Sequence, residues 1–134
     1  MTTPAEQCSG LILFAHGARD PLWAEPLLLL LEKVRQAAPS VPAEVAFLES
    51  MTPDLNDAVA RLVAAGSVNI RIVPIFFGRG GHLRRDLPEL VTRVQAKWPR
   101  TQISTAVSVG EDEAVLDALT QFCLRALEST SART

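Results

Sequence analysis

The sequence is poor in the residues that build disulfide frameworks and thiolate metal sites. Its 134 residues include two cysteines, Cys8 and Cys123, which lie far apart and form no C-x-x-C pair. Disulfide scaffolds and structural zinc sites need several cysteines at close spacing. Neither class of protein is expected, and a reducing, cytoplasmic setting is favoured.

Long apolar runs and strong charge are also missing. No stretch approaches the roughly 20 apolar residues that a membrane span needs. The start, MTTPAEQCSG, lacks the basic and apolar regions of a secretory leader. The formal net charge of −2 gives no whole-chain reason to expect nucleic acid. We therefore expect a cytoplasmic protein with neither a membrane nor a nucleic-acid partner.

Three familiar catalytic motifs are incomplete or missing. The glycines at 78, 80 and 81 are followed by His82 and Leu83, so the third glycine of a G-x-G-x-x-G dinucleotide fingerprint is lacking. Ala15 stands before His16 where a phosphohistidine enzyme would carry arginine. No G-x-S-x-G is present, which excludes the nucleophile elbow of serine hydrolases.

What is present predicts one α/β domain over residues 10–128, between tails at 1–9 and 129–134. Apolar residues make up 48% of a chain that is short enough for one core. Apolar runs predict buried strands, and a weaker alternating run predicts an edge strand; they span residues 10–15, 43–49, 70–77 and, for the edge, 102–108.

Helical apolar stripes follow each strand. Thr52 and Pro53 are predicted as N-cap and first residue of the second helix, and Gly66 as its end. Further stripes include Leu83 to Trp98 and Val115 to Leu127. The first helix, about 27–38, is apolar nearly all round, which predicts burial on two sides or in a subunit interface. It begins near Pro26, or at Pro21 with a bend.

Strand–helix alternation predicts a mostly parallel sheet with helices on both faces, and ligands in such sheets bind beyond the carboxyl ends of the strands. His16 follows the first strand, Glu49 ends the second and Gly78 to His82 follow the third. Two imidazoles and a carboxylate suit Co²⁺, Ni²⁺, Fe²⁺ or Zn²⁺. Each residue also has a structural alternative, as a helix cap or an ordinary strand-end carboxylate.

The glycines and arginines of VPIFFGRGGHLRRDLPEL have two interpretations as well. Glycines form tight turns, and they also let a bulky ligand approach the backbone. Arg79, Arg84 and Arg85 fit a solvated face or a clamp for an anionic substrate.

The segments LILFAHGARDP, FLESMTPDLNDAVARLVAAG and VPIFFGRGGHLRRDLPEL resemble, in order and spacing, those of the small class II tetrapyrrole chelatases, the sirohydrochlorin cobaltochelatase and ferrochelatase family. The resemblance covers about residues 10–128. It implies a chelatase-like three-layer sandwich with a four-stranded, mostly parallel sheet. It also implies a homodimer that holds the macrocycle in a cleft between and within subunits.

The resemblance implies a metal site of His16, Glu49 and His82, with both histidines catalytic. The metal, Co²⁺, Fe²⁺ or Ni²⁺, is then a substrate inserted into sirohydrochlorin or a related tetrapyrrole. No organic cofactor and no iron–sulfur cluster is expected. Substrate-binding candidates are Arg19, Gly78, Arg79, Gly80, Gly81, Arg84 and Arg85.

The chain departs from the family pattern at three places: Ala18, where serine is usual, the loop FFGRGG, and SVGEDEAV after the last strand. Three alternatives stay open. They are a metal-binding or metal-delivery protein without turnover, an anion- or nucleotide-binding module that uses the GRGG loop and the next helix, and a degenerate chelatase domain. The physiological metal and the pathway, cobalamin or sirohaem, also stay open.

Overall fold

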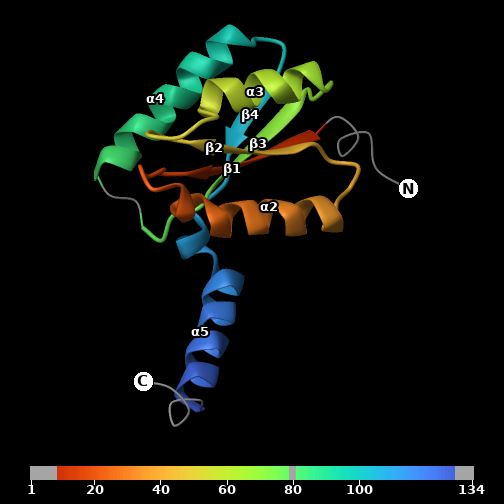
Figure 1. Ribbon diagram of the computed structural model, residues 1–134. Helices are drawn as coiled ribbons and strands as arrows, with labels where there is room; N and C mark the ends of the chain where they lie inside the picture. The colour runs from red at the N-terminus through yellow and green to blue at the C-terminus, as the bar shows by residue number, and fades with distance from the viewer. Residues whose placement is uncertain (1–8, 79–80, 129–134) are drawn as a thin grey trace.

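The computed structural model describes residues 9–78 and 81–128, apart from the side chains of residues 81–84. Strands and helices alternate along the chain (Figure 1). The strands are β1 (Ser9–Ala15), β2 (Ala43–Phe47), β3 (Asn69–Pro74) and β4 (Gln102–Thr105). The helices are α2 (Glu25–Ala37), α3 (Leu55–Ala64), α4 (Gly81–Lys97) and α5 (Glu113–Glu128), with the 3₁₀ turns η1 (Pro21–Ala24) and η2 (Val109–Glu111).

The four strands form one sheet in the order β2-β1-β3-β4, and every pair is parallel. The predicted α/β class and parallel sheet are confirmed. β4 lies at an edge, as its alternating pattern predicted. β2 lies at the other edge, yet its side chains are largely buried because α2 and α3 both pack against it. β3 ends at Pro74, before the predicted Phe77.

Successive side chains of β1 point to opposite faces of the sheet and enter two separate cores. Ile12 and Phe14 join the core that α3 and α4 cover, and Leu13 joins the core beneath α2. Figure 1 shows α3 and α4 on one side of the sheet and α2 on the other. This arrangement is the predicted three-layer sandwich.

The start of α3 differs from the sequence prediction. Asp54, not Thr52, is the N-cap, and Leu55, not Pro53, is the first helical residue. The Asp54 carboxylate accepts from the Asp57 N–H at 2.8 Å, and the Asp57 carboxylate accepts from the Asp54 N–H at 3.3 Å. This reciprocal capping box decides the start. The prediction for Gly66 is confirmed, since it follows the C-cap with φ of +95°.

Helix α2 begins at Glu25 and has Pro26 in its first turn, which confirms the predicted start near Pro26. Pro21 opens the separate η1 turn that precedes it. Only Leu27 and Leu31 are buried. Leu28 and Leu29 are 49% and 66% exposed, so burial of α2 on two sides within the chain is wrong. Its role in a subunit interface stays a prediction.

Helix α5 does not join either layer. Its predicted apolar stripe is present, but none of its residues is buried. In Figure 1 the helix extends away from the sandwich. No helix in the described part of the chain is long and apolar enough to cross a membrane.

Candidate metal centre

The ends of β1 and β2 bring His16 and Glu49 together. The Nε2 atom of His16 lies 3.0 Å from Oε1 of Glu49. The two side chains are 57% and 62% exposed, so the pair is open to solvent. A metal ion or a large planar molecule can therefore reach both groups without rearrangement of the core.

Backbone pairing beyond the strands explains this approach. The Leu48 N–H donates to the Ala15 carbonyl at 2.9 Å, and the Glu49 N–H donates to the His16 carbonyl at 3.1 Å. Gly17 has φ of +91°, and a β-carbon there would collide with the Glu49 carbonyl oxygen. Only glycine satisfies both conditions. The sequence analysis did not predict this role of Gly17, although the residue directly follows the candidate ligand His16.

The spacing of the pair suits shared ligation. Imidazole nitrogen and carboxylate oxygen bind first-row divalent metals at about 2.1 Å, so ligand atoms 3.0 Å apart subtend about 90° at one ion. This is the angle between neighbouring ligands in an octahedron. Without an ion, the same atoms are within hydrogen-bonding distance. The site has the donor types that the sequence predicted for two of its three ligands.

The third predicted ligand, His82, belongs to the first turn of α4, and its side chain lies outside the described ones. Among the described side chains, no group of three or more His, Cys, Asp or Glu residues is placed to hold a metal. The complete His16, Glu49 and His82 set thus stays a prediction.

The loop that leads to His82 is held from two sides. The Ile75 N–H donates to the Phe14 carbonyl at 2.8 Å, and the Phe76 carbonyl accepts from the Gly110 N–H at 3.0 Å. A β-carbon on Gly110 would collide with the Phe77 backbone. The η2 turn of SVGEDE, which departs from the family pattern, therefore supports the loop that precedes α4. Apart from the glycine itself, no sequence pattern predicts this contact.

The remaining predicted site residues are only partly described. Gly78 is exposed and has open space where a β-carbon would lie, and Gly81 is the first residue of α4. Arg85 is exposed on α4. Arg79 and Gly80 lie outside the described residues, as does the side chain of Arg84.

Arg19 lines a cavity of about 860 Å³ between α2 and the β2 edge. Ser50 and Met51, which follow Glu49, line the same cavity. It also contains Arg35 and Arg61, and both pair with Glu44, at 3.4 Å and 3.2 Å. Three guanidinium groups against one carboxylate leave this cavity net positive, which suits an anionic ligand.

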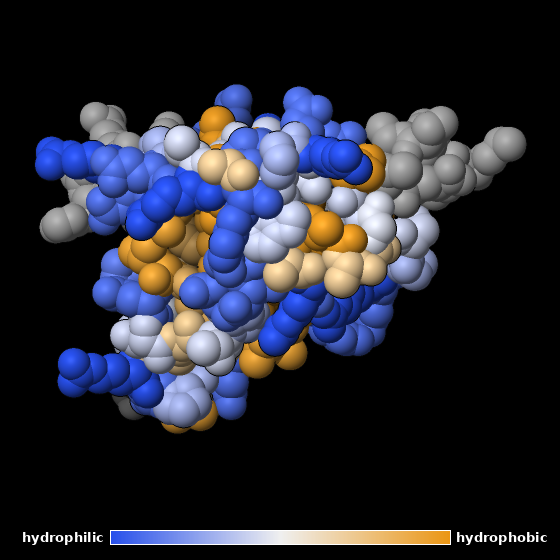
Figure 2. Space-filling view, turned by 90° about the horizontal axis from the view of Figure 1, so that it is seen from above, coloured by the Kyte–Doolittle hydropathy of each residue, from blue (hydrophilic) through white to orange (hydrophobic). Residues whose placement is uncertain are grey.

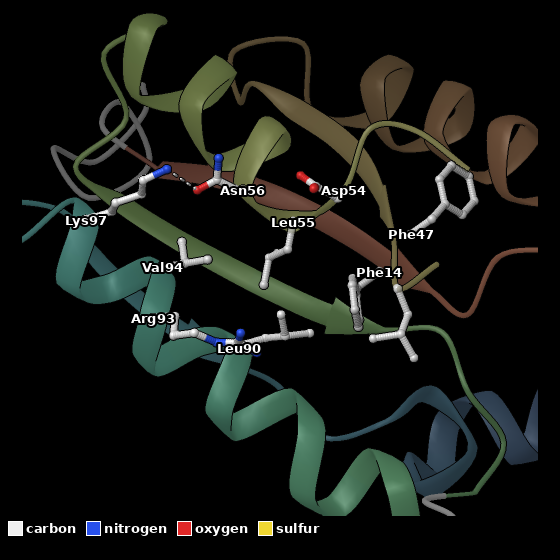
Figure 3. A pocket seen from close by; sticks show the side chains of 10 residues that line it. Phe14, Phe47, Asp54, Leu55, Asn56, Leu90, Arg93, Val94 and Lys97 are labelled. Atoms are coloured by element: carbon white, nitrogen blue, oxygen red, sulfur yellow. Dashed lines mark hydrogen bonds between the residues drawn. The ribbon is translucent and has the colours of Figure 1, made fainter. Parts of the chain in front are cut away.

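A second cavity, of about 420 Å³, opens between α3 and α4 and reaches Leu48, the neighbour of Glu49. Seen from the side of these helices, the surface is largely polar with apolar residues showing between polar ones (Figure 2). Phe14, Leu55 and Val94 line the cavity with apolar side chains (Figure 3). At its rim the Lys97 ammonium donates to Asn56 Oδ1 at 3.3 Å.

The family model for CbiX matches residues 10–126 of this sequence. The chain belongs to the CbiX family. The resemblance seen in the sequence is confirmed by this match.

Two relatives of this CbiX chain carry activity names. The sirohydrochlorin cobaltochelatase of Sulfolobus acidocaldarius is 32% identical over 124 residues, which cover 91% of this chain and 97% of that protein. The sirohydrochlorin ferrochelatase of Priestia megaterium is 23% identical over 121 residues, which cover 90% of this chain and 46% of that protein. The second relative is thus about twice as long as the matched region.

The crystal structure of a CbiX protein from Marinobacter aquaeolei VT8 has the same fold. It superposes with a TM-score of 0.82 at 30% sequence identity and covers 91% of this chain and 99% of that one. Chains of nearly equal length therefore share this arrangement of sheet and helices.

Proposed function

We propose that this CbiX-family chain inserts a divalent metal ion into sirohydrochlorin and is thus a metal chelatase. In the reaction M²⁺ replaces two pyrrole N–H protons, which leave the macrocycle. Relatives named for this activity with cobalt and with iron support the proposal. The observation that carries it is the solvent-accessible pair of His16 and Glu49, 3.0 Å apart at the carboxyl edge of the sheet.

The pair supplies the groups that insertion requires. His16 binds the ion as neutral imidazole, and the Glu49 carboxylate offsets part of the ion's charge. When the ion moves into the ring, one of these groups is freed and accepts one pyrrole proton, and the second proton passes to solvent water, to which the pair is open. His82 is proposed as the second imidazole ligand, because α4 begins just beyond the same edge of the sheet.

Cobalt is the first metal to test, and Fe²⁺ and Ni²⁺ follow. Imidazole and carboxylate accept all three ions, so the ligands alone do not select one. The metal is a substrate, and the proposed reaction needs no organic cofactor and no iron–sulfur cluster.

Positive side chains are proposed to hold the carboxylates of sirohydrochlorin. Arg19 and Arg85 are exposed, and Arg19 borders the loop that carries Glu49. Guanidinium groups bind carboxylates in two-pronged hydrogen bonds. The full proposed set is Arg19, Gly78, Arg79, Gly80, Gly81, Arg84 and Arg85.

A cytoplasmic homodimer is proposed as the working form, with no nucleic-acid or membrane partner. The Priestia megaterium relative has about as much chain again beside the region that matches. A second copy of this chain supplies an equal length of polypeptide.

The experiment is the visible spectrum of sirohydrochlorin with Co²⁺, recorded alone, with this protein, and with His16→Ala, His82→Ala and Glu49→Gln variants. Glu32→Gln is the matched control, because Glu32 is an exposed carboxylate on α2 that accepts a hydrogen bond from Gln36 and is not among the proposed site residues. We expect faster insertion by the parent and the control, and loss in the three site variants. Bound Co²⁺ without faster insertion would replace the proposal by a metal-delivery function.

A further inference from the structure

Helix α5 is a 16-residue arm with little contact to its own domain. None of its residues is buried, and its main contacts in the described chain are with the neighbouring η2 turn. Figure 1 shows it leaving the sandwich on the side of α2. A helix of this length is marginally stable in water by itself, because helices gain most of their stability from packing. The arm therefore needs a surface to pack against.

The arm has one apolar face and one polar face. At 100° per residue, Val115, Leu119 and Phe122 fall on the same side, together with Leu116, Cys123, Ala126 and Leu127. Leu116, Phe122 and Leu127 are 41%, 60% and 69% exposed. The opposite side carries Asp117, Gln121 and Glu128, and among them one leucine, Leu124. We call the first set the arm stripe.

The base of the arm is fixed by specific contacts. The Val115 N–H donates to the Asp112 carboxylate at 3.1 Å, which caps the helix. The Gly110 N–H donates to the Phe76 carbonyl, and Gly110 packs directly on the Phe77 backbone. These contacts join the start of the arm to the loop that precedes α4.

A second exposed apolar surface, which could pack against the arm stripe, lies on η1 and α2. Leu22 and Trp23 are 65% and 73% exposed, and Leu28 and Leu29 are 49% and 66% exposed. Leu22 and Trp23 belong to η1, and Leu28 and Leu29 belong to the first turns of α2. Large exposed apolar side chains that gather on one part of a protein mark interaction surfaces. We call these four residues the α2 face.

We propose that α5 docks its arm stripe on the α2 face of a second copy of this chain, and that the second copy returns the same contact. The inference rests on the homodimer of the proposed function and names its surface. The doubled length of the Priestia megaterium relative favours a second copy over an unrelated partner. Reciprocal docking about a two-fold axis buries both surfaces on both copies.

The arm is long enough to cover the receiving helix, because α5 has 16 residues and α2 has 13. A helix of 16 residues is about 24 Å long. A stable interface buries roughly 800 Å² on each partner. Each copy contributes one arm and one receiving face, and a symmetric pair therefore contains two such contacts.

Mass measurement in solution by light scattering tests the arm stripe. We expect the parent to have twice the 14.5 kDa mass of one chain, and the double variant Phe122→Ser, Leu127→Ser to have half the parent mass. Leu124→Ser is the matched control, because it removes an exposed leucine from the other face of the same helix, and it should stay dimeric. A monomeric parent, or a dimer that only the control variant disrupts, would overturn the proposal.

Disulfide crosslinking tests the receiving surface. Cys123 is exposed within the arm stripe. In a Cys8→Ser background, Leu29→Cys should give a covalent dimer on mild oxidation, and adding Cys123→Ser should abolish it. Crosslinking through Cys123 alone would show that two arms pair with each other and would overturn the α2 face. A monomeric protein that still inserts cobalt would refute this interface and leave the proposed chelatase activity intact. A crosslinked dimer that does not insert cobalt would support the interface and refute the proposed activity.

Discussion

The main-chain carbonyl of Glu49 lies in the space that a β-carbon on Gly17 would occupy. The contact joins the segments that follow β1 and β2, and these segments carry the two halves of the candidate metal centre. The Glu49 N–H donates to the His16 carbonyl in the same place. The separation of the two side chains therefore depends on a glycine that itself contacts no ligand.

Gly17→Ala should destabilise the protein and weaken Co²⁺ binding. Alanine at φ of +91° is strained, and its β-carbon would push Glu49 away from His16. We expect a loss of at least about 2 kcal/mol in the free energy of unfolding. Gly66→Ala is the matched control. It has φ of +95° but open space around it, so it should cost roughly 1 kcal/mol and leave metal affinity unchanged. Equal metal affinity in both variants would contradict the prediction.

Metal binding should weaken as the pH is lowered. A protonated imidazole has no free lone pair, so an ion and a proton compete for the same nitrogen. We therefore expect Co²⁺ affinity to be lower at acidic pH than at alkaline pH. Calorimetric titration of the parent and of His16→Ala measures this, and the variant should lose part of the dependence. An affinity independent of pH would exclude histidine ligation.

Salt should weaken sirohydrochlorin binding more than Co²⁺ binding. Exposed arginines attract the carboxylates of the macrocycle through solvent, where salt screens the attraction. Arg19→Gln should weaken binding of the macrocycle about two- to fivefold at low salt. Arg100→Gln is the comparison, since Arg100 is exposed beyond the far end of α4. If fluorescence titration shows the same affinity for both variants, Arg19 belongs to a solvated surface.

Gly110→Ala should disturb the loop before α4 although it lies on the other side of β4 in the sequence. Its β-carbon would overlap the Phe77 backbone, which has no flexible end to move aside. We expect a loss of about 1–3 kcal/mol in unfolding free energy and slower insertion of cobalt. Thermal unfolding and the insertion assay measure the two effects. A variant with parental stability would show that the η2 turn does not support the loop.

The strands were predictable because β1, β2 and β3 are covered by helices and read as short apolar runs. β4 was predictable as an edge because only part of it is covered. The start of α3 was not predictable from the sequence, since Thr52, Pro53 and Asp54 are all suitable residues for a helix start. The capping box of Asp54 and Asp57 decided between them.

The candidate metal centre was also predictable only in part. The order of elements predicted that His16 and Glu49 share one edge of the sheet, because the carboxyl ends of parallel strands meet there. It could not predict that the two side chains lie 3.0 Å apart, since that depends on the Gly17 contact and on hydrogen bonds beyond the strands.

The sequence by itself determined the α/β class, the parallel sheet, the resemblance to the chelatases and the candidate ligands, because local patterns and residue types carry that information. Only the tertiary structure decided which apolar stripes are buried. The stripes of α3 and α5 look alike in sequence, yet α3 packs on the sheet and α5 does not. Periodicity identifies an apolar face, but the surface that covers it depends on how the chain is arranged in space.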